Sequence, residues 1–185
     1  GAVDQALEAR PDFPEGELLL AKILEKMDRD EEADEAFRKL MERCPDYSCA
    51  YREYARFLLK KKGQADRAEC LLLRGLALNP QDGFGHALLA EIYAQTGRVK
   101  QAVLHLRIAS RREGNTYLHQ CCGKVFLQMG RYSEAAEQFR LALTADPRNK
   151  EARSQLKLVL KLQRKGILSL AKIPWLKKGD PVEEK

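Results

Sequence analysis

Small and apolar residues recur along the chain at a spacing that predicts pairs of short helices. The pattern is clearest between Thr116 and Asn149, a stretch of 34 residues. Counted from Thr116, positions 8, 15, 20, 24, 27 and 32 hold Gly123, Gly130, Ala135, Phe139, Ala142 and Pro147. Each half of the stretch has room for a helix of about 12 to 14 residues, which cannot bury its apolar face alone. The pattern therefore predicts antiparallel helix pairs that stack on one another.

The same frame fits three earlier segments, residues 83–115, 48–82 and 14–47. Residues 83–115 carry Ala90, Tyr93, Gly97, Ala102, Leu106 and Ala109, with Gly114 in place of the closing proline. Residues 48–82 carry Tyr54, Ala55, Leu58, Gly63, Ala68, Leu72, Gly75 and Pro80, provided that the turn KKKG takes one extra residue. Residues 14–47 carry Leu20, Ala21, Leu24, Ala33, Phe37, Leu40 and Pro45. We therefore expect four repeats.

These residues make the chain resemble the tetratricopeptide repeat, a unit of two antiparallel helices. The resemblance implies an all-α, right-handed superhelical solenoid of antiparallel helix pairs. Glycine at position 15 suits the reversal between the two helices, where a left-handed backbone is free only for glycine. Gly63, Gly97 and Gly130 take that place, and Asp28 takes it in the first repeat because Asp tolerates tight turns.

Partial elements are expected at both ends of the array. Ala6, Leu7 and Pro11 match positions 27, 28 and 32, so residues 1–13 are expected to be the second helix of a truncated repeat, in a fragment of a longer protein. Residues 150–166 resemble the capping helix that closes many such arrays, with Gly166 as its expected end. Residues 167–185, which include Trp175, are expected to form a basic, partly disordered tail.

Positive charge gathers at this C-terminal end. Residues 150–178 contain nine Lys and Arg against a single acidic residue, Glu151. Such an end can contact an anionic membrane, nucleic acid or an acidic partner. The alternative, which the sequence favours, is a solvated cap whose Lys and Arg stems cover apolar surface.

In the family that the chain resembles, the first helix of each repeat lines a concave groove that holds a protein or peptide. Carrying over the groove positions gives a basic beginning, with Arg52 and Arg56 able to grip carboxylates, followed by a more aromatic and amide-rich stretch. An extended peptide with acidic and apolar side chains would suit this order. The expected partner-binding residues are Lys22, Lys26, Arg52, Arg56, Lys60, Phe84, Glu91, Tyr117, Gln120 and Lys124.

The sequence offers little for catalysis or for cofactors. No phosphate-binding glycine loop, zinc-protease motif or nucleophile elbow is present, and the acidic residues Glu31, Glu32 and Asp34 are expected on an exposed helix start. His86 and His119 share position 4 of their repeats, which indicates packing. The adjacent Cys121 and Cys122 could be a redox pair or a soft-metal site, but cysteine also fills helix interfaces. We expect no catalytic residue, metal or cofactor.

Composition agrees with a helical protein of a reducing compartment. Five cysteines form no CxxC pair, charged residues make up 32%, and the apolar runs fall short of the roughly 20 residues that span a membrane. We expect a cytoplasmic or nuclear scaffold that binds a protein or peptide, without a small-molecule substrate. Two alternatives stay open: a regulatory or anchoring segment of a larger enzyme, and an adaptor that uses the basic end on RNA or a membrane.

Overall fold

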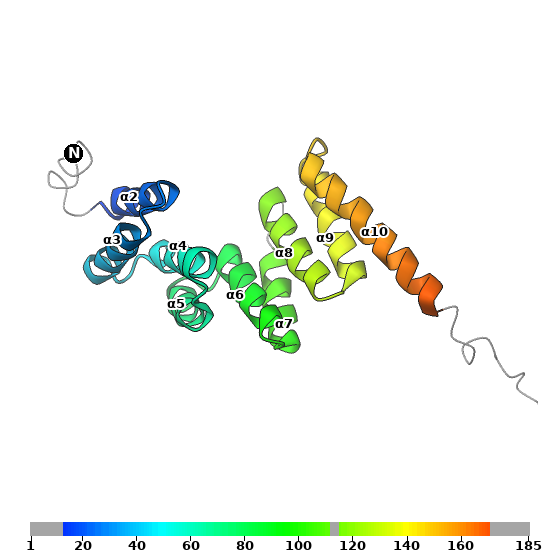
Figure 1. Cartoon of the computed structure of the whole chain (residues 1–185), viewed down its shortest axis with the longest axis horizontal. Coiled ribbons are helices and arrows are strands. Elements are labelled where there is room, and N and C mark those ends of the chain that lie inside the picture. Colours follow the sequence, from blue (N-terminus) through cyan, green and yellow to red (C-terminus); the bar gives the residue numbers. More distant parts are fainter. Residues whose placement is uncertain (1–12, 112–114, 171–185) are drawn as a thin grey trace, which may run out of the picture. The chain divides into compact units, whose positions relative to one another are not determined.

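The computed structural model describes residues 13–111 and 115–170, with side chains as far as residue 165, and every regular element in those ranges is a helix (Figure 1). This confirms the expected all-α fold of antiparallel helix pairs. The elements are α2 (Pro14–Lys26), α3 (Asp30–Arg43), α4 (Ser48–Phe57), the π-helical turn η1 (Leu58–Lys62), α5 (Ala65–Leu78), α6 (Gly83–Gln95), α7 (Val99–Ser110), α8 (Thr116–Gln128), α9 (Tyr132–Ala145) and α10 (Lys150–Leu170).

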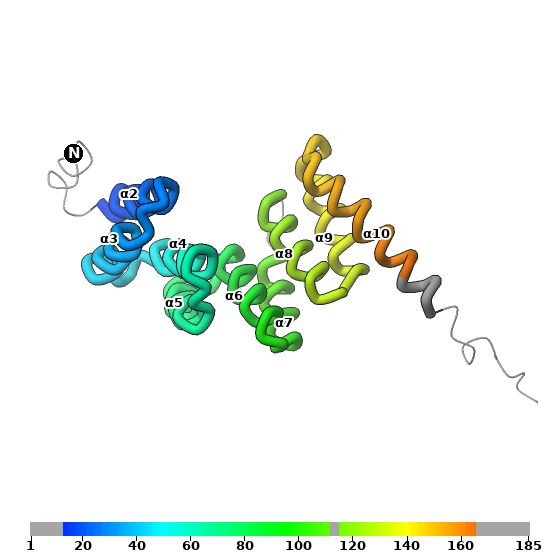
Figure 2. The backbone as a smooth tube through the Cα atoms, viewed as in Figure 1, coloured from blue at the N-terminus to red at the C-terminus, as the bar shows by residue number. Residues whose placement is uncertain are grey.

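The chain divides into two compact units. The first unit spans residues 1–109 and contains α2 to α7, and the second spans residues 110–185 and contains α8, α9 and α10. The backbone tube in Figure 2 reverses direction between the helices of each pair, for example between α8 and α9. Because each reversal is short, neighbouring helices are antiparallel and can pack along their lengths.

The four reversals inside the helix pairs use left-handed backbone, as expected from the sequence. Gly63, Gly97 and Gly130 have φ of 61°, 75° and 70°. Asp28 has a φ of 55°, and among the non-glycine residues of the described ranges it alone has a positive φ. An added Cβ at the three glycines would meet no neighbouring atom, so the backbone angle rather than space explains why glycine stands there.

We expected the extra residue of the second repeat to lie in the turn, but it is accommodated inside the helix before the turn. After Phe57 the helix widens into η1, where the N–H of Gly63 bonds to the carbonyl of Leu58, five residues earlier. A π-helical turn holds one residue more than the α-helical turn that it replaces. The insertion therefore leaves Gly63 at the reversal.

An aromatic cluster forms the core of the first unit. Phe37 of α3 stacks on Tyr54 of α4 with ring centroids 5.2 Å apart, and Phe57 lies 5.5 Å from Phe37. Tyr54 also donates a hydrogen bond of 3.0 Å to Asp34. Asp34 is thus buried against the cluster, and our expectation of an exposed carboxylate was wrong because the α3 face that holds Phe37 also holds Asp34.

Close packing of small against large residues organises the second unit. A Cβ added at Gly123 of α8 would lie 2.8 Å from the Phe139 ring of α9, so only glycine fits there. Helix α10 packs on α9, with Ala152 and Val159 fully buried. The amphipathic pattern of residues 150–166 thus serves the role expected of a capping helix.

The end of α10 differs from the expectation. The helix continues past Gly166 and ends at Leu170. A glycine inside a helix costs only about 1 kcal/mol relative to alanine, and the good helix former Leu168 follows it.

Other expectations concern residues outside the described ranges. They are the truncated repeat in residues 1–12, the turn at Gly114, and residues 171–185 of the basic tail with Trp175. The exact repeat boundaries of 14–47, 48–82, 83–115 and 116–149 stay predictions.

Candidate protein-interaction surface

The first helices of the first unit are joined by ion pairs. Helix α4 supplies Arg52, Glu53 and Arg56, and Arg56 neighbours both of the others on the helix surface because it follows them by four and three residues. Lys22 and Glu25 come from α2, and Asp82 is the N-cap of α6. We call these six residues the first-helix network. It contains three cations and three carboxylates, so its formal charge is zero.

Arg56 and Glu25 form a two-pronged ion pair within this network. The two guanidinium nitrogens of Arg56 donate to the two carboxylate oxygens of Glu25 at 3.0 and 2.5 Å. The Glu25 side chain is 6% exposed and that of Arg56 is 30% exposed. This forked geometry joins α2 to α4 and is among the strongest polar contacts available to a protein.

Arg52 and Glu53 extend the network toward α6. Arg52 donates to Asp82 at 2.8 Å and lies over the ring of Phe84, 5.9 Å from its centroid. Glu53 accepts from both Arg52 and Arg56 and pairs with Lys22 at 3.4 Å. Burial by itself raises the pKa of Glu53, but Lys22, Arg56 and Arg52 outweigh it and hold the pKa below its ordinary value.

The two arginines expected to grip a partner's carboxylates therefore already hold carboxylates of this chain. Burial works against the charge of each arginine, but Asp82 and Glu25 outweigh it and raise both pKa values. An incoming acidic group would have to displace a partner that is part of the fold. The sequence could not show this because each arginine and its partner are about 30 residues apart.

Two lysines at the ends of these helices are differently placed. Lys26 of α2 and Lys60 of η1 are both exposed, at the same position of neighbouring repeats, and neither makes an ion pair with a described residue. Glu91 of α6 is half-buried, and burial raises its pKa. Lys26 and Lys60 are therefore the predicted site residues of the first unit whose charges stay available.

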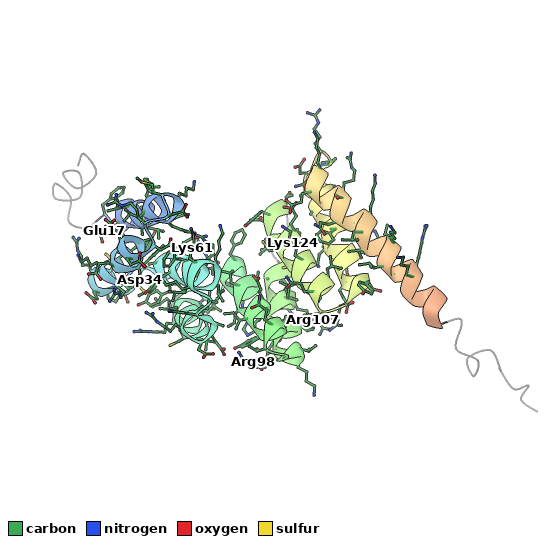
Figure 3. All side chains as sticks on the ribbon, in the orientation of Figure 1. Glu17, Asp34, Lys61, Arg98, Arg107 and Lys124 are labelled. Atoms are coloured by element: carbon green, nitrogen blue, oxygen red, sulfur yellow. The ribbon has the colours of Figure 1, made fainter. Side chains whose placement is uncertain are left out.

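In the second unit, the three predicted site residues have different surroundings. Tyr117 of α8 is 64% exposed. Lys124, labelled in Figure 3, pairs with Glu151 of α10 at 2.6 Å. Gln120 is buried and donates to Asn149, whose side chain also caps α10 by accepting from the N–H of Ala152. The amide of Gln120 joins α8 to the start of α10, and its expected contact with a partner stays a prediction.

An exposed apolar stripe on α2 was missed from the sequence. Leu19, Ile23 and Met27 stand one turn apart and are 59%, 38% and 58% exposed. The position of Ile23 is buried in the later first helices, where Phe57, Ile92 and Val125 occupy it. The spacing of four residues was the available signal, but these positions lay outside the groove set carried over from the family.

The histidines and the adjacent cysteines occupy packing positions. His86 and His105 share a hydrogen bond between their Nδ1 atoms of 2.8 Å, and Nε2 of His86 donates to the carbonyl of Pro80 at 3.1 Å. His119 is buried and bonded to Gln138. Cys122 is fully buried, and burial, with Cys121 beside it, raises the pKa of its thiol to about 12. A thiol of that pKa is not a nucleophile near neutral pH.

Within the described ranges, no group of three or more His, Cys, Asp or Glu side chains could hold a metal ion. None of the helices there has both the length and the hydropathy needed to cross a bilayer.

Comparisons with known proteins agree with this fold. A family model described as tetratricopeptide repeat matches residues 18–47 and 123–149. A thermophilic tetratricopeptide-repeat protein of Thermus thermophilus, TTC0263, is similar over 85% of this chain and 87% of its own, at 24% identity and a TM-score of 0.74.

Two further solved structures are similar. PilW, a type IV pilus biogenesis factor, covers 92% of this chain and 84% of its own, at 14% identity and a TM-score of 0.68. YrrB, described as a repeat protein with an unusual peptide-binding site, covers 89% of this chain and 84% of its own, at 19% identity and a TM-score of 0.62. Together with the stacked helix pairs, these matches show that the chain has a fold similar to that of tetratricopeptide-repeat proteins.

Proposed function

We propose that the protein is a non-catalytic scaffold that binds a partner protein or peptide along the first helices of its first unit. The observation that carries the proposal is the apolar stripe Leu19, Ile23 and Met27, with the exposed Lys26 on the same helix and the exposed Lys60 at the matching position of the next repeat. Exposed apolar side chains that gather on one face mark protein contacts. The description of YrrB as peptide-binding supports the same use of the fold.

The charges on this surface indicate which kind of partner fits it. The first-helix network is electrically balanced, so it braces the helices, while Lys26 and Lys60 supply the charge that a partner meets. A segment with apolar side chains on one side and a few acidic residues on the other fits this surface. Contacts through Phe84 and Glu91 of α6 remain part of the proposal, while Tyr117 and Lys124 stay predicted contacts of the second unit by itself.

The test compares the unmodified whole chain with two variants and a matched control. Proteins captured by the unmodified chain are identified by mass spectrometry, and the binding of the leading partner is then measured with purified components. The first variant, Lys26→Glu with Lys60→Glu, is expected to weaken binding about tenfold, because each reversed charge meets an acidic partner. A second variant, Leu19→Ser with Ile23→Ser, is expected to abolish capture.

The matched control reverses two lysines on second helices, Lys39→Glu in α3 and Lys100→Glu in α7. It changes the net charge by the same amount and is expected to keep binding. Equal loss in the control and in the lysine variant would mean that net charge, and not this surface, decides binding. Unchanged binding by both first-helix variants would contradict the proposed site.

A further inference from the structure

One face of α10 carries a row of exposed cations. Ala152 and Val159 are buried on the side that packs on α9, and nitrogen-tipped side chains extend from α10 away from α9 in Figure 3. At 100° per residue these cations fall within an arc of about 120°, over a length of about 22 Å. We call them the basic stripe: Lys150, Arg153, Lys157, Lys161, Arg164 and Lys165.

The charge of the basic stripe is not compensated within the described residues. Glu151 is the acidic residue of α10, and it pairs with Lys124 of α8. The contact found for the stripe is a hydrogen bond of 2.5 Å from Arg153 to the carbonyl of Pro147, which leaves the positive charge in place. Six cations thus face solvent without a carboxylate of the described chain beside them.

This arrangement does not serve the helix itself. From Lys150 to Arg164 successive cations are three or four residues apart, and Lys165 is four residues from Lys161, which places like charges next to one another on the helix surface. Lys150 and Arg153 also stand in the first turn, where the helix dipole disfavours positive charge. An external anion would relieve both effects.

The shape of the stripe favours a phosphate backbone over other anions. A membrane-binding helix needs a free apolar face, but that face of α10 is occupied by α9, and Leu158 is the large apolar side chain that stays exposed on α10. The length of the stripe, about 22 Å, equals the rise of about six successive phosphates of one strand at about 3.4 Å each. The stripe has no aromatic side chain to stack on bases, so contacts would go to phosphates.

We propose that the basic stripe of α10 binds the phosphodiester backbone of nucleic acid without sequence preference. This activity is separate from the proposed protein contact on α2 and would make the chain an adaptor between a nucleic acid and a protein.

The test measures binding of the full chain to a labelled 20-nucleotide RNA and to a 20-base-pair DNA duplex by fluorescence anisotropy. With four phosphate contacts on duplex DNA, affinity is expected to fall about 100-fold between about 50 and 200 mM salt. The variant Lys157→Gln, Lys161→Gln, Arg164→Gln is expected to lose at least about tenfold in affinity and most of the salt dependence. Comparing the RNA and DNA arms shows which backbone is preferred.

The control variant, Lys39→Gln, Lys100→Gln, Arg140→Gln, removes the same charge from α3, α7 and α9 and is expected to bind as the unmodified chain does. Circular dichroism checks that both variants are folded. Equal binding by the two variants would overturn the proposal.

Two further measurements test whether the stripe binds an acidic protein or a membrane surface instead. Polyglutamate that displaces RNA at equal charge would overturn the proposal in favour of an acidic protein. Binding to phosphatidylserine vesicles without binding to either nucleic acid would overturn it in favour of a membrane surface.

Discussion

Cationic side chains have opposite surroundings in the first unit and on α10. On α4, Arg52 and Arg56 each lie against carboxylates from neighbouring helices, Asp82 and Glu25, and are largely withdrawn from solvent. On α10, six cations face solvent, and the one acidic residue of the helix pairs with Lys124 instead. Both regions are rich in Lys and Arg by sequence, so composition alone does not separate them.

This difference distinguishes cations that join helices from cations that are available to bind a partner. A cation that is buried with a forked carboxylate contributes to the joining of helices, and its removal leaves the carboxylate without compensation. A cation in an exposed row contributes little to folding, and nearby like charges even oppose it. Stability measurements should therefore separate the two regions before any partner is known.

The largest expected effect is the loss of Arg56. Arg56→Met leaves Glu25 buried and unpaired, and we expect the free energy of unfolding to fall by about 2 kcal/mol, since part of the arginine reaches solvent. Urea unfolding followed by circular dichroism measures this change. The control Lys39→Met breaks an exposed pair with Glu35 and should cost less than about 0.5 kcal/mol. Similar costs for both variants would remove the distinction between the regions.

A smaller effect is expected on acidification. Burial lowers the pKa of His105, and His86 lowers it further, so the unfolded chain binds a proton at higher pH than the folded chain does. Below the ordinary histidine pKa of about 6.5, the free energy of unfolding should therefore decrease until the pH reaches the folded-state pKa of His105. Unfolding curves between about pH 7.5 and 5.5 measure this.

The variant His105→Gln keeps a hydrogen-bond donor for His86 and should make the pH dependence shallower in that window. The control His119→Gln removes a histidine of the second unit. If the control flattens the curve as much as His105→Gln does, His105 is not the responsible group.

The next effect concerns the helix that carries the basic stripe. Gly166→Ala should stabilise α10 by about 0.7 kcal/mol, because alanine is the better residue inside a helix. Thermal unfolding and helix content by circular dichroism report it. For comparison, Gly130→Ala, at a left-handed reversal, should destabilise the protein. A loss of stability in Gly166→Ala would indicate that the helix ends at Gly166 after all.

The smallest effect is expected inside the basic stripe. Lys157→Gln with Lys161→Gln removes the like-charge pairs that these lysines form with each other and with cations three or four residues away, and should raise the free energy of unfolding by about 0.4 kcal/mol at low salt. The gain should vanish near 1 M salt, where the charges are screened. A clear loss of stability would mean that these lysines do structural work and would bring α10 closer to the first unit.

Much of the fold could be predicted from the sequence because its signals are local. The left-handed residues Gly63, Gly97 and Gly130, and Asp28 in the same place, fix the reversals between helices. Small residues opposite aromatic ones, such as Gly123 opposite Phe139, identify the packed faces. These features repeat along the chain, and repetition makes each one more reliable than it would be alone.

The interaction surface could be predicted less well because it depends on residues far apart in sequence. Arg56 meets Glu25 across 31 positions, and Gln120 meets Asn149 across 29. A groove position inferred from a single repeat says nothing about the side chain that the neighbouring repeat places beside it. The available charge on Lys26 and Lys60 becomes visible only after the pairs around them are known.

The π-helical turn η1 shows how one repeat of an array can accommodate an inserted residue. A one-residue insertion in an ordinary helix would rotate everything beyond it by about 100° and turn the apolar face toward solvent. Here Leu58 stays fully buried before the insertion and Gly63 keeps its left-handed angle after it. The wider turn confines the insertion to Leu58–Lys62, so the chain can gain a residue without shifting the repeats that follow.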